Sequence, residues 1–369
     1  MKRITYIISF IDKAVAFEWI ATHLNARKYQ LSFILLNPGS SDLHDFLHAH
    51  NIPVTSIHYS GKKDLPKATW QVFRLLKKTK PHIVHCHLFD ACIAGLTAAY
   101  MAGVKKRIHT RHHSSYHHTY FPHAVKYDRY INRLSTHIVA ISRVVADVLL
   151  FKEQVPAHKV SIIHHGFDLS SFHSNPGLTQ SLALKYNPRR QSPVIGVVSR
   201  FTEWKGIQFI IPAFKKLLAT YPTARLLLFN AAGNYAAEIG HMLQDLPSEN
   251  YEAVTFEKEL FSTFPIFNVF VHVPVDKDCE AFGQVYIESM AAGVPAVFTL
   301  SGIATEVITD RHNALVVDYR NSEAIYQAMT ALLEDPDLCN TLKINASETV
   351  KKNFSLEKMI FNLEQLYDQ

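Results

Sequence analysis

Short apolar runs alternate with helix-like segments along almost the whole chain, and this alternation constrains the fold more than any other feature. Each apolar run predicts a buried strand, and each amphipathic segment predicts a helix. In the first series, strands are predicted at 4–11, 31–36, 83–85, 107–110 and 137–141, and helices at 14–24, 68–78 and 91–101. Such alternation predicts βαβ units, in which helices cover both faces of a parallel sheet.

A second series of predicted strands occupies residues 194–198, 225–229, 269–273 and 296–298. Between the two series, residues 173–192 are rich in Ser, Asn, Pro and Gly and are predicted as a linker. The predicted fold class is α/β, with two Rossmann-like doubly wound domains at 1–172 and 193–350 and a terminal helix within 351–369. In such sheets ligands bind beyond the carboxyl ends of the strands, so we expect the site in a central cleft between the domains.

The composition predicts a globular protein without a membrane span. The 369 residues are 48% hydrophobic, and no stretch is apolar for long enough to cross a bilayer. The apolar run at 4–11 is short and lacks a small-residue cleavage site, so we interpret it as a strand and not as a signal peptide. The four cysteines include no C-x-x-C pair, which fits a reducing, cytoplasmic compartment.

The charge is divided unevenly along a chain whose net charge is +6. Residues 1–150 hold 20 Lys and Arg against 8 Asp and Glu, whereas the remainder holds 18 against 24. A basic half indicates an anionic partner, and the alternative is a simple solvated surface. Nucleic acid is not the expected partner, because the chain has no zinc-finger spacing, RNA-recognition signature or Arg-rich tract.

Two glutamates, Glu280 and Glu288, lie eight residues apart around Phe282-Gly283-Gln284, at the predicted start of a helix. Free amides and the positive end of the helix dipole favour anionic oxygens there, and Gly283 lets the backbone approach a ligand closely. An ionised carboxylate at each end suits a ligand rich in hydroxyls. The alternative is that both glutamates are ordinary acids of an exposed helix.

Two cations, Arg200 and Lys205, follow the first strand of the second domain. A planar guanidinium and a compact ammonium can together neutralise the charge on a departing diphosphate. The alternative is a pair of surface cations after a strand.

These segments resemble those of retaining glycosyltransferases with the GT-B architecture, of the family-four (glycosyl transferases group 1) type. Residues 279–288 are similar to the Glu-x7-Glu signature of that family, and residues 199–206 to its Gly-Arg…Lys-Gly segment, with Ser199 in place of the glycine. Two further segments, 159–168 and 301–308, are also similar to segments of the family, although His164 and His165 replace a Pro-Asn pair.

The resemblance implies a role for each of these residues. Glu280 would orient the donor sugar as a catalytic residue, and Glu288 would hold the ribose hydroxyls. The implied donor-binding set is Arg200, Lys205, Phe282, Gly283, Gln284 and Glu288. No metal and no other cofactor is implied, because the nucleotide-sugar is the substrate and its diphosphate charge is met by these groups.

His112 follows a predicted strand, in a segment similar to the Thr-x-His of the family. The resemblance implies that His112 lies beside the donor sugar as a second catalytic residue, and a structural histidine is the alternative. Several histidines crowd residues 109–123, where a metal site is conceivable. No cysteine or carboxylate at zinc spacing supports a metal, so none is predicted.

The first strand–helix turn departs from the family pattern, which often has a Gly-Gly pair there. This chain has Asp12-Lys13, and Asp12 is predicted as the N-cap of the next helix. The alternative is that Asp12 or Lys13 contacts the acceptor.

The resemblance as a whole implies a retaining glycosyltransferase that moves a sugar from a UDP- or GDP-sugar to a hydroxyl of a glycan or lipid-linked acceptor. It also implies a pathway of cell-surface polysaccharide synthesis, and a basic first domain docked on the anionic inner face of the membrane. The terminal helix would return to the first domain. A GT-B sugar-nucleotide epimerase and a non-catalytic protein that binds a nucleotide or a partner are the alternatives.

Overall fold

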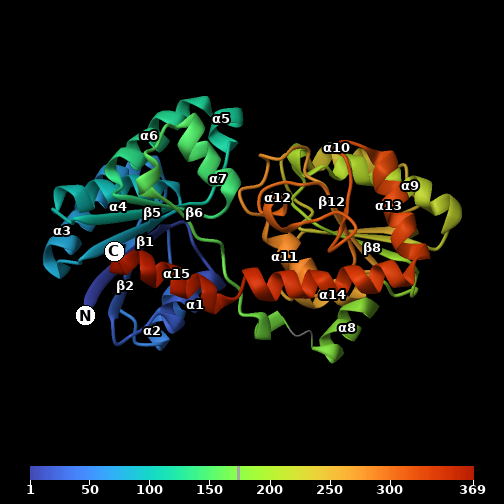
Figure 1. Cartoon of the computed structure of the whole chain (residues 1–369), viewed down its shortest axis with the longest axis horizontal. Helices are drawn as coiled ribbons and strands as arrows, with labels where there is room; N and C mark the ends of the chain where they lie inside the picture. Colours follow the sequence, from blue (N-terminus) through green and yellow to red (C-terminus); the bar gives the residue numbers. More distant parts are fainter. Residues whose placement is uncertain (173–174) are drawn as a thin grey trace. The chain divides into compact units, whose positions relative to one another are not determined.

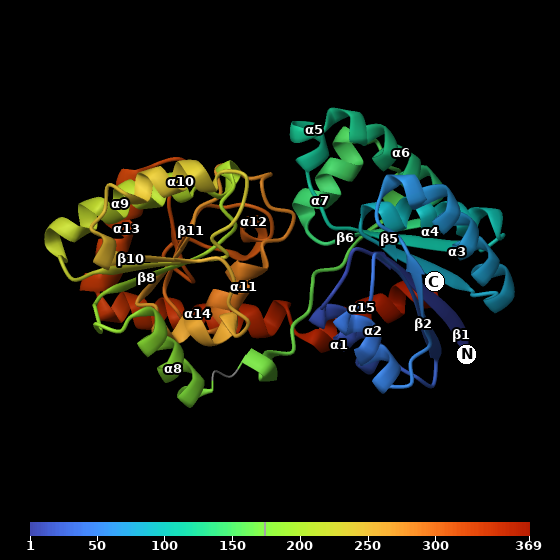
Figure 2. The same ribbon diagram turned by 180° about the vertical axis from the view of Figure 1, so that it is seen from behind.

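The computed structural model describes residues 1–172 and 175–369, which form two compact units. The first unit holds residues 1–167 together with 354–369, and the second holds 168–353 (Figure 1). Each unit is a sheet of parallel strands with helices on both faces (Figure 2). The predicted α/β class with two Rossmann-like sheets is therefore confirmed.

The sheet of the first unit has seven strands in the order β3-β2-β1-β4-β5-β6-β7. The strands are β1 Lys2–Ser9, β2 Tyr29–Asn37, β3 Val54–His58, β4 Ile83–His87, β5 Lys106–Arg111, β6 His137–Ala140 and β7 Val160–Ile162. Strand β1 lies inside the sheet, where Ile7 is in register with Ile34 of β2 and with Cys86 of β4. Both faces of β1 are covered, which is why its sequence is a continuous apolar run.

Two hydrophobic cores sandwich this sheet, because successive side chains of a strand point to opposite faces. Ile4, Tyr6 and Ile8 pack under α1, α2 and α15, whereas Ile7 packs under α3, α4 and α6. The helices are α1 Val15–His23, α2 Asp42–Ala49, α3 Leu65–Thr79, α4 Phe89–Met101, α5 Tyr116–Tyr120, α6 Val125–Leu134, α7 Arg143–Asp147 and α15 Leu356–Asp368.

Helix α15, the last element of the chain, is part of the first unit. Its Tyr367 hydroxyl lies 2.8 Å from Nδ1 of the buried His85 and also contacts the hydroxyl of Tyr6. The other nitrogen of His85, Nε2, lies 2.8 Å from the Thr110 hydroxyl of β5. A buried polar chain therefore ties the C-terminal helix to the centre of the sheet.

The sheet of the second unit has six strands in the order β10-β9-β8-β11-β12-β13. Its strands are β8 Val194–Val198, β9 Arg225–Phe229, β10 Tyr251–Val254, β11 Val269–His272, β12 Ala296–Phe298 and β13 Leu315–Val316. Its helices are α8 Pro176–Tyr186, α9 Ile207–Thr220, α10 Ala236–Leu243, α11 Gln284–Ala291, α12 Ala304–Val307, α13 Ser322–Glu334 and α14 Pro336–Asn353. Helices α9, α10 and α13 share one aliphatic core with this sheet.

The predicted linker at 173–192 instead contains helix α8, and residues 173–174 lie outside the described part. Asn175 is the N-cap of α8, since its side chain accepts hydrogen bonds from the amides of Gly177 (3.0 Å) and Leu178 (3.3 Å). Near the end of α8, Tyr186 is buried and its hydroxyl contacts Glu257. Asn175 and Pro176, which lie within the predicted linker, are therefore the start of a helix.

Among the helices of the described residues, none is both long enough and apolar enough to cross a membrane.

Candidate active site

The adjacent strands β8 and β11 carry the predicted donor-binding residues of the second unit. After β8 the chain forms a short 3-10 helix, Glu203–Lys205, and after β11 it runs to Glu280. The ammonium of Lys205 contacts Oε1 of Glu280. His272, the last residue of β11, places its Nε2 3.3 Å from the same oxygen. Two cation-capable side chains thus meet one carboxylate at the carboxyl edge of the sheet.

Glu280 is a buried carboxylate, with only 8% of its surface exposed. Burial alone raises the pKa of a carboxyl, but Lys205 and His272 outweigh that effect and lower the pKa of Glu280 to about 2. The Glu280 amide donates to the buried Ser301 hydroxyl at 3.0 Å, which fixes the backbone. Glu280 is therefore ionised at neutral pH and held in one place.

Gly283 is the N-cap of α11 and has a φ of +82°, a left-handed conformation that glycine adopts without strain. A Cβ at this position would lie only 2.7 Å from the Tyr286 ring. Tyr286 is fully buried, and its hydroxyl donates to the carbonyl of Thr299 at 2.9 Å, so it cannot move aside easily. Position 283, at the start of α11, therefore requires glycine. Its neighbours in the sequence are the buried Phe282 and the exposed Gln284.

Glu288 lies in the second turn of α11, in an environment unlike that of Glu280. Within the described residues, its carboxylate makes no hydrogen bond and no ion pair. Burial raises the pKa of Glu288 to about 7. Arg200 is exposed beyond β8. Both residues belong to the second unit, and their predicted roles in donor binding stay predictions.

His112 lies in the first unit, directly after β5. Its Nε2 is 3.2 Å from Nδ1 of His87, and its ring is stacked on His165 with centroids 5.7 Å apart. Burial, assisted by the neighbouring histidines, lowers the pKa of His112 to about 3. The side chain is therefore a neutral imidazole, which can donate or accept a hydrogen bond but carries no charge. Its catalytic role stays a prediction.

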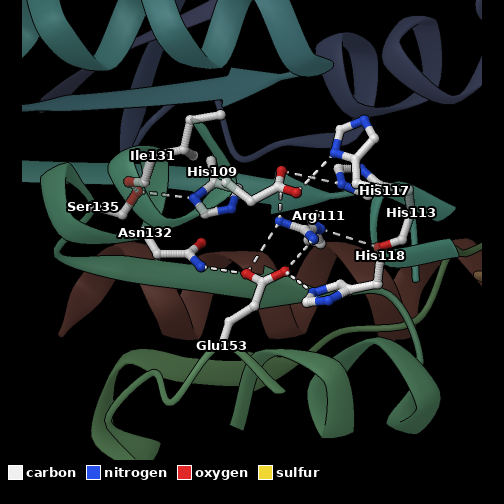
Figure 3. Close-up of polar contacts among 10 residues, drawn as sticks. His109, Arg111, His113, His117, His118, Ile131, Asn132, Ser135 and Glu153 are labelled. Atoms are coloured by element: carbon white, nitrogen blue, oxygen red, sulfur yellow. Dashed lines mark hydrogen bonds and ion pairs between the residues drawn. The ribbon is translucent and has the colours of Figure 1, made fainter. Parts of the chain in front are cut away.

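A buried ion-pair network around Arg111, the residue before His112, organises the histidine-rich segment (Figure 3). Arg111 pairs with Asp128 of α6 at 3.0 Å and with Glu153 at 2.6 Å, and its Nε donates to the carbonyl of His113 at 3.1 Å. The same two carboxylates also bind the histidines that follow Arg111 in the sequence. His113 and His117 are hydrogen-bonded to Asp128, and His118 is hydrogen-bonded to Glu153.

Three of these groups, His113, His117 and Asp128, have ligand atoms within 4.8 Å of one another and are the metal-like cluster of this unit. Arg111 already holds Oδ1 of Asp128, and His117 lies 2.7 Å from Oδ2. A metal cation here would face a buried guanidinium. We therefore interpret the cluster as an ion-pair network that fixes the loop after β5.

The prediction for Asp12 as the N-cap of the first helix is wrong. The N-cap of α1 is Ala14, which has no side chain that could accept a hydrogen bond. Asp12 instead accepts from the amide of Asp42, the first residue of α2, at 3.2 Å, and its carbonyl accepts from Leu43 at 2.9 Å. Asp12 thus binds the start of α2, while Lys13 is exposed, and an acceptor contact by either stays a prediction.

The structure places Lys205, Glu280 and Gly283, which were predicted as site residues, at one edge of one sheet, and their roles stay predictions. Sequence reasoning placed His112, Asp12 and Lys13 in the first unit, where they lie. It missed His272, because a histidine within an apolar run is indistinguishable from a core residue. It also missed Asp128 and Glu153. For Asp128, a lone acid among the basic residues of a helix is a usable signal for a buried ion pair.

Two models of known families match the chain. Residues 182–349 match the family model described as glycosyl transferases group 1, and residues 18–171 match the model described as glycosyltransferase family 4. The first match includes Arg200, Lys205, Glu280 and Glu288, and the second includes His112.

Individual relatives are distant but cover most of the chain. The chain is 25% identical over 338 residues to the capsular polysaccharide biosynthesis glycosyltransferase CapM of Staphylococcus aureus, covering 87% of this chain and 84% of CapM. It is 21% identical to the UDP-Gal:alpha-D-GlcNAc-diphosphoundecaprenol alpha-1,3-galactosyltransferase of Escherichia coli, covering 89% of this chain and 86% of that enzyme.

Solved structures agree on the fold. The structure of Anabaena Alr3699/HepE in complex with UDP and glucose aligns over 100% of both chains with a TM-score of 0.85 and 17% identity. That identity supports a shared GT-B fold and nothing finer. From the two family matches and the shared architecture together, the chain belongs to the group 1 glycosyltransferases of GT-B fold and is a transferase enzyme.

Proposed function

We propose that the protein is a retaining glycosyltransferase that moves a sugar from a UDP- or GDP-sugar to a hydroxyl of a glycan or lipid-linked acceptor. The observation that carries the proposal is the contact of Lys205 with Glu280 beside the start of α11. A cation, a buried carboxylate and free helix amides there match the charge and hydroxyl pattern of a nucleotide-sugar. The capsule and diphosphoundecaprenol activities in the names of the relatives support an acceptor of cell-surface polysaccharide synthesis.

In the proposed reaction, the bond between the sugar C1 and the diphosphate oxygen breaks. Arg200, Lys205 and the amides at Gly283 and Gln284 would balance the charge on the departing diphosphate. The acceptor hydroxyl attacks C1 on the same face and gives its proton to a diphosphate oxygen. Glu280, which is ionised, would orient the sugar and stabilise the cationic transition state.

This scheme gives no step to a metal ion or to a nucleophilic side chain, and we propose that the activity is metal-independent. The neutral imidazole of His112 would hold a sugar hydroxyl by a hydrogen bond, and the Glu288 carboxylate would accept from the ribose. An activity that EDTA abolishes, and that Mg²⁺ or Mn²⁺ restores, contradicts the metal-free scheme.

We also propose that the first unit docks on an anionic membrane through α5 and α6. Most of the exposed side chains here are aromatic or basic, and the one acid of α6, Asp128, is buried. Among them are Tyr116, Tyr120, Phe121, Tyr127, Tyr130, Lys126, Arg129 and Arg133. Aromatic rings favour the membrane interface and cations favour anionic headgroups, so two weak attractions act together. Sedimentation with phosphatidylglycerol vesicles, but not with phosphatidylcholine vesicles, is the expected result.

The first test is a thermal-shift titration with UDP, GDP and ADP. A nucleotide at a hundredfold excess over its dissociation constant stabilises the protein by about 2.7 kcal/mol. We expect a shift with UDP or GDP that is lost in the double variant Arg200→Ala/Lys205→Ala. No shift with any nucleotide contradicts the proposal.

The nucleotide that binds then selects the donors for a transfer assay with undecaprenol-linked and soluble glycan acceptors. The anomeric coupling constant of the product, compared by NMR with that of the donor, tests retention. An inverted product contradicts the retaining mechanism and leaves the glycosyltransferase activity standing.

A further inference from the structure

His272 is an unusual residue for its position. It ends β11, the run Val269–His272, and has 1% of its surface exposed. Neither ring nitrogen has a well-formed hydrogen bond to any of the described residues. The closest polar contact of the ring is the approach of Nε2 to the Glu280 carboxylate at 3.3 Å. A buried polar group that is so weakly partnered costs free energy, so its presence calls for an explanation.

The ring of His272 is aimed by its surroundings. It packs edge-on against the Tyr286 ring, with centroids 4.7 Å apart and planes at 78°. Tyr286 is itself anchored through its hydroxyl to the Thr299 carbonyl. This packing holds Nε2 3.3 Å from Oε1 of Glu280, a distance at which a small adjustment completes a hydrogen bond.

Lys205 and His272 both lie against the same oxygen of Glu280. Under the proposed function, Lys205 also binds the donor diphosphate, whereas His272 does not. A donor diphosphate attracts the Lys205 ammonium, which weakens the contact that Lys205 makes with Glu280. Lys205 is the one Lys or Arg that pairs with Glu280 among the described residues. A buried carboxylate that loses its close cation is strongly destabilised. His272 is the other group within reach, and its nitrogens are not committed elsewhere among the described residues.

We propose that His272 is a positioning residue that takes over Oε1 of Glu280 when a nucleotide-diphosphate donor draws Lys205 away. The carboxylate then stays ionised and correctly aimed at the sugar while the ammonium serves the diphosphate. This inference rests on the proposed function, because it needs a donor at Lys205. It assigns to β11 a residue that acts through Glu280 and does not touch the substrate.

Two substitutions at one position test the proposal. His272→Leu places an apolar side chain in the buried strand and removes the hydrogen-bonding ring nitrogen. His272→Gln instead provides an N–H group near the position of Nε2. We expect His272→Leu to lower kcat by about 10- to 100-fold, the effect of losing one hydrogen bond to a charged group, while the KM for the donor changes little. His272→Gln should recover most of kcat.

A direct readout comes from ¹⁵N spectra of histidine-labelled protein. Addition of the nucleotide diphosphate should shift the Nε2 resonance of His272 in the wild type but not in Glu280→Gln. A purely structural role of His272 predicts instead that His272→Leu and His272→Gln both lower the melting temperature, and that His272→Gln does not recover kcat.

The possible failures are distinguishable. If the wild-type protein binds the nucleotide and turns over, and His272→Leu has the same kcat, this inference is overturned and the proposed function stands. A wild-type protein that binds no nucleotide overturns both.

Discussion

At the scale of single residues, Glu280 and Glu288 show how environment separates two identical side chains. Glu280 lies against Lys205 and His272, and its pKa is lowered to about 2. Glu288 has no such partner among the described residues, and burial raises its pKa to about 7. One carboxylate is therefore permanently charged, whereas the other changes its charge within the physiological range.

Donor affinity should consequently depend on pH. If the ionised form of Glu288 accepts the ribose hydroxyls, affinity is full above pH 8 and falls as pH drops through 7. Between pH 8 and pH 6 the dissociation constant should rise about tenfold, since the ionised fraction falls by that factor. Calorimetric titration of the nucleotide across this range measures it. Glu288→Gln is the control, because it removes the titration of the Glu288 carboxyl and leaves the titration of the nucleotide phosphate. If the dissociation constant of the variant depends on pH as steeply as that of the wild type, Glu288 does not bind the ribose as proposed.

Removing Lys205 should destabilise the second unit. Lys205→Met leaves the buried carboxylate of Glu280 without its cation, which we expect to lower the free energy of unfolding by about 3 kcal/mol at pH 7. The stability that this pair supplies to the wild type is present above the ordinary carboxyl pKa and is lost as pH falls towards 2. Urea denaturation measures both effects. The double variant Lys205→Met/Glu280→Gln should be more stable than Lys205→Met, and an equal loss in both would argue against a coupled pair.

Sequence reasoning found residues whose chemistry is unusual for their place in the pattern. A Phe-Gly pair between two glutamates and a Lys-Gly pair after a strand are such signals. His272 gives none, because its importance depends on Glu280 folding back over the end of β11. Asp12 gave a misleading signal, since a side chain before a helix can cap a different helix that the fold brings alongside.

At the scale of elements, helix α8 replaces most of a predicted loop. Asn175 caps its first amides, and Asn175→Ala should cost about 1 kcal/mol of stability. Ser181→Ala, at an exposed position of the same helix, is the matched control and should change stability by less than about 0.5 kcal/mol. Chemical denaturation of both variants measures the difference, and equal stabilities would mean that the cap contributes nothing.

The central strands of both sheets could be predicted because both of their faces are buried, which leaves continuous apolar runs in the sequence. Helix α8 could not be predicted in the same way. Its apolar pattern is weak, with Leu182 and Tyr186 as its buried side chains, and its capping residues are those of a turn. The position of α8 is fixed by residues far along the chain, such as Glu257, which accepts a hydrogen bond from the Tyr186 hydroxyl. Local sequence patterns do not reveal such contacts.

At the scale of the whole molecule, the first unit is built from both ends of the chain. Helix α15 supplies Met359, Leu363 and Leu366 to the core that includes Ile4 and Tyr6. Lys2, near the start of the chain, donates to the carbonyl of Tyr367 at 2.9 Å. The first unit is therefore complete only after the whole second unit has been synthesised, which makes its folding a long-range event.

The two units should respond separately to changes made in each. Leu363→Ala removes a buried side chain from the first unit and should cost it about 2 to 5 kcal/mol, whereas Phe361→Ala, at an exposed position of the same helix, should cost little. A nucleotide that binds at Lys205 should stabilise the second unit by mass action. Scanning calorimetry, with tryptic digestion to identify the unit that opens, resolves the two responses. Because the core of each unit is its own, Leu363→Ala should lower the transition of the first unit and leave the nucleotide-induced shift of the second intact. A single transition that moves with both changes would show that the units unfold as one.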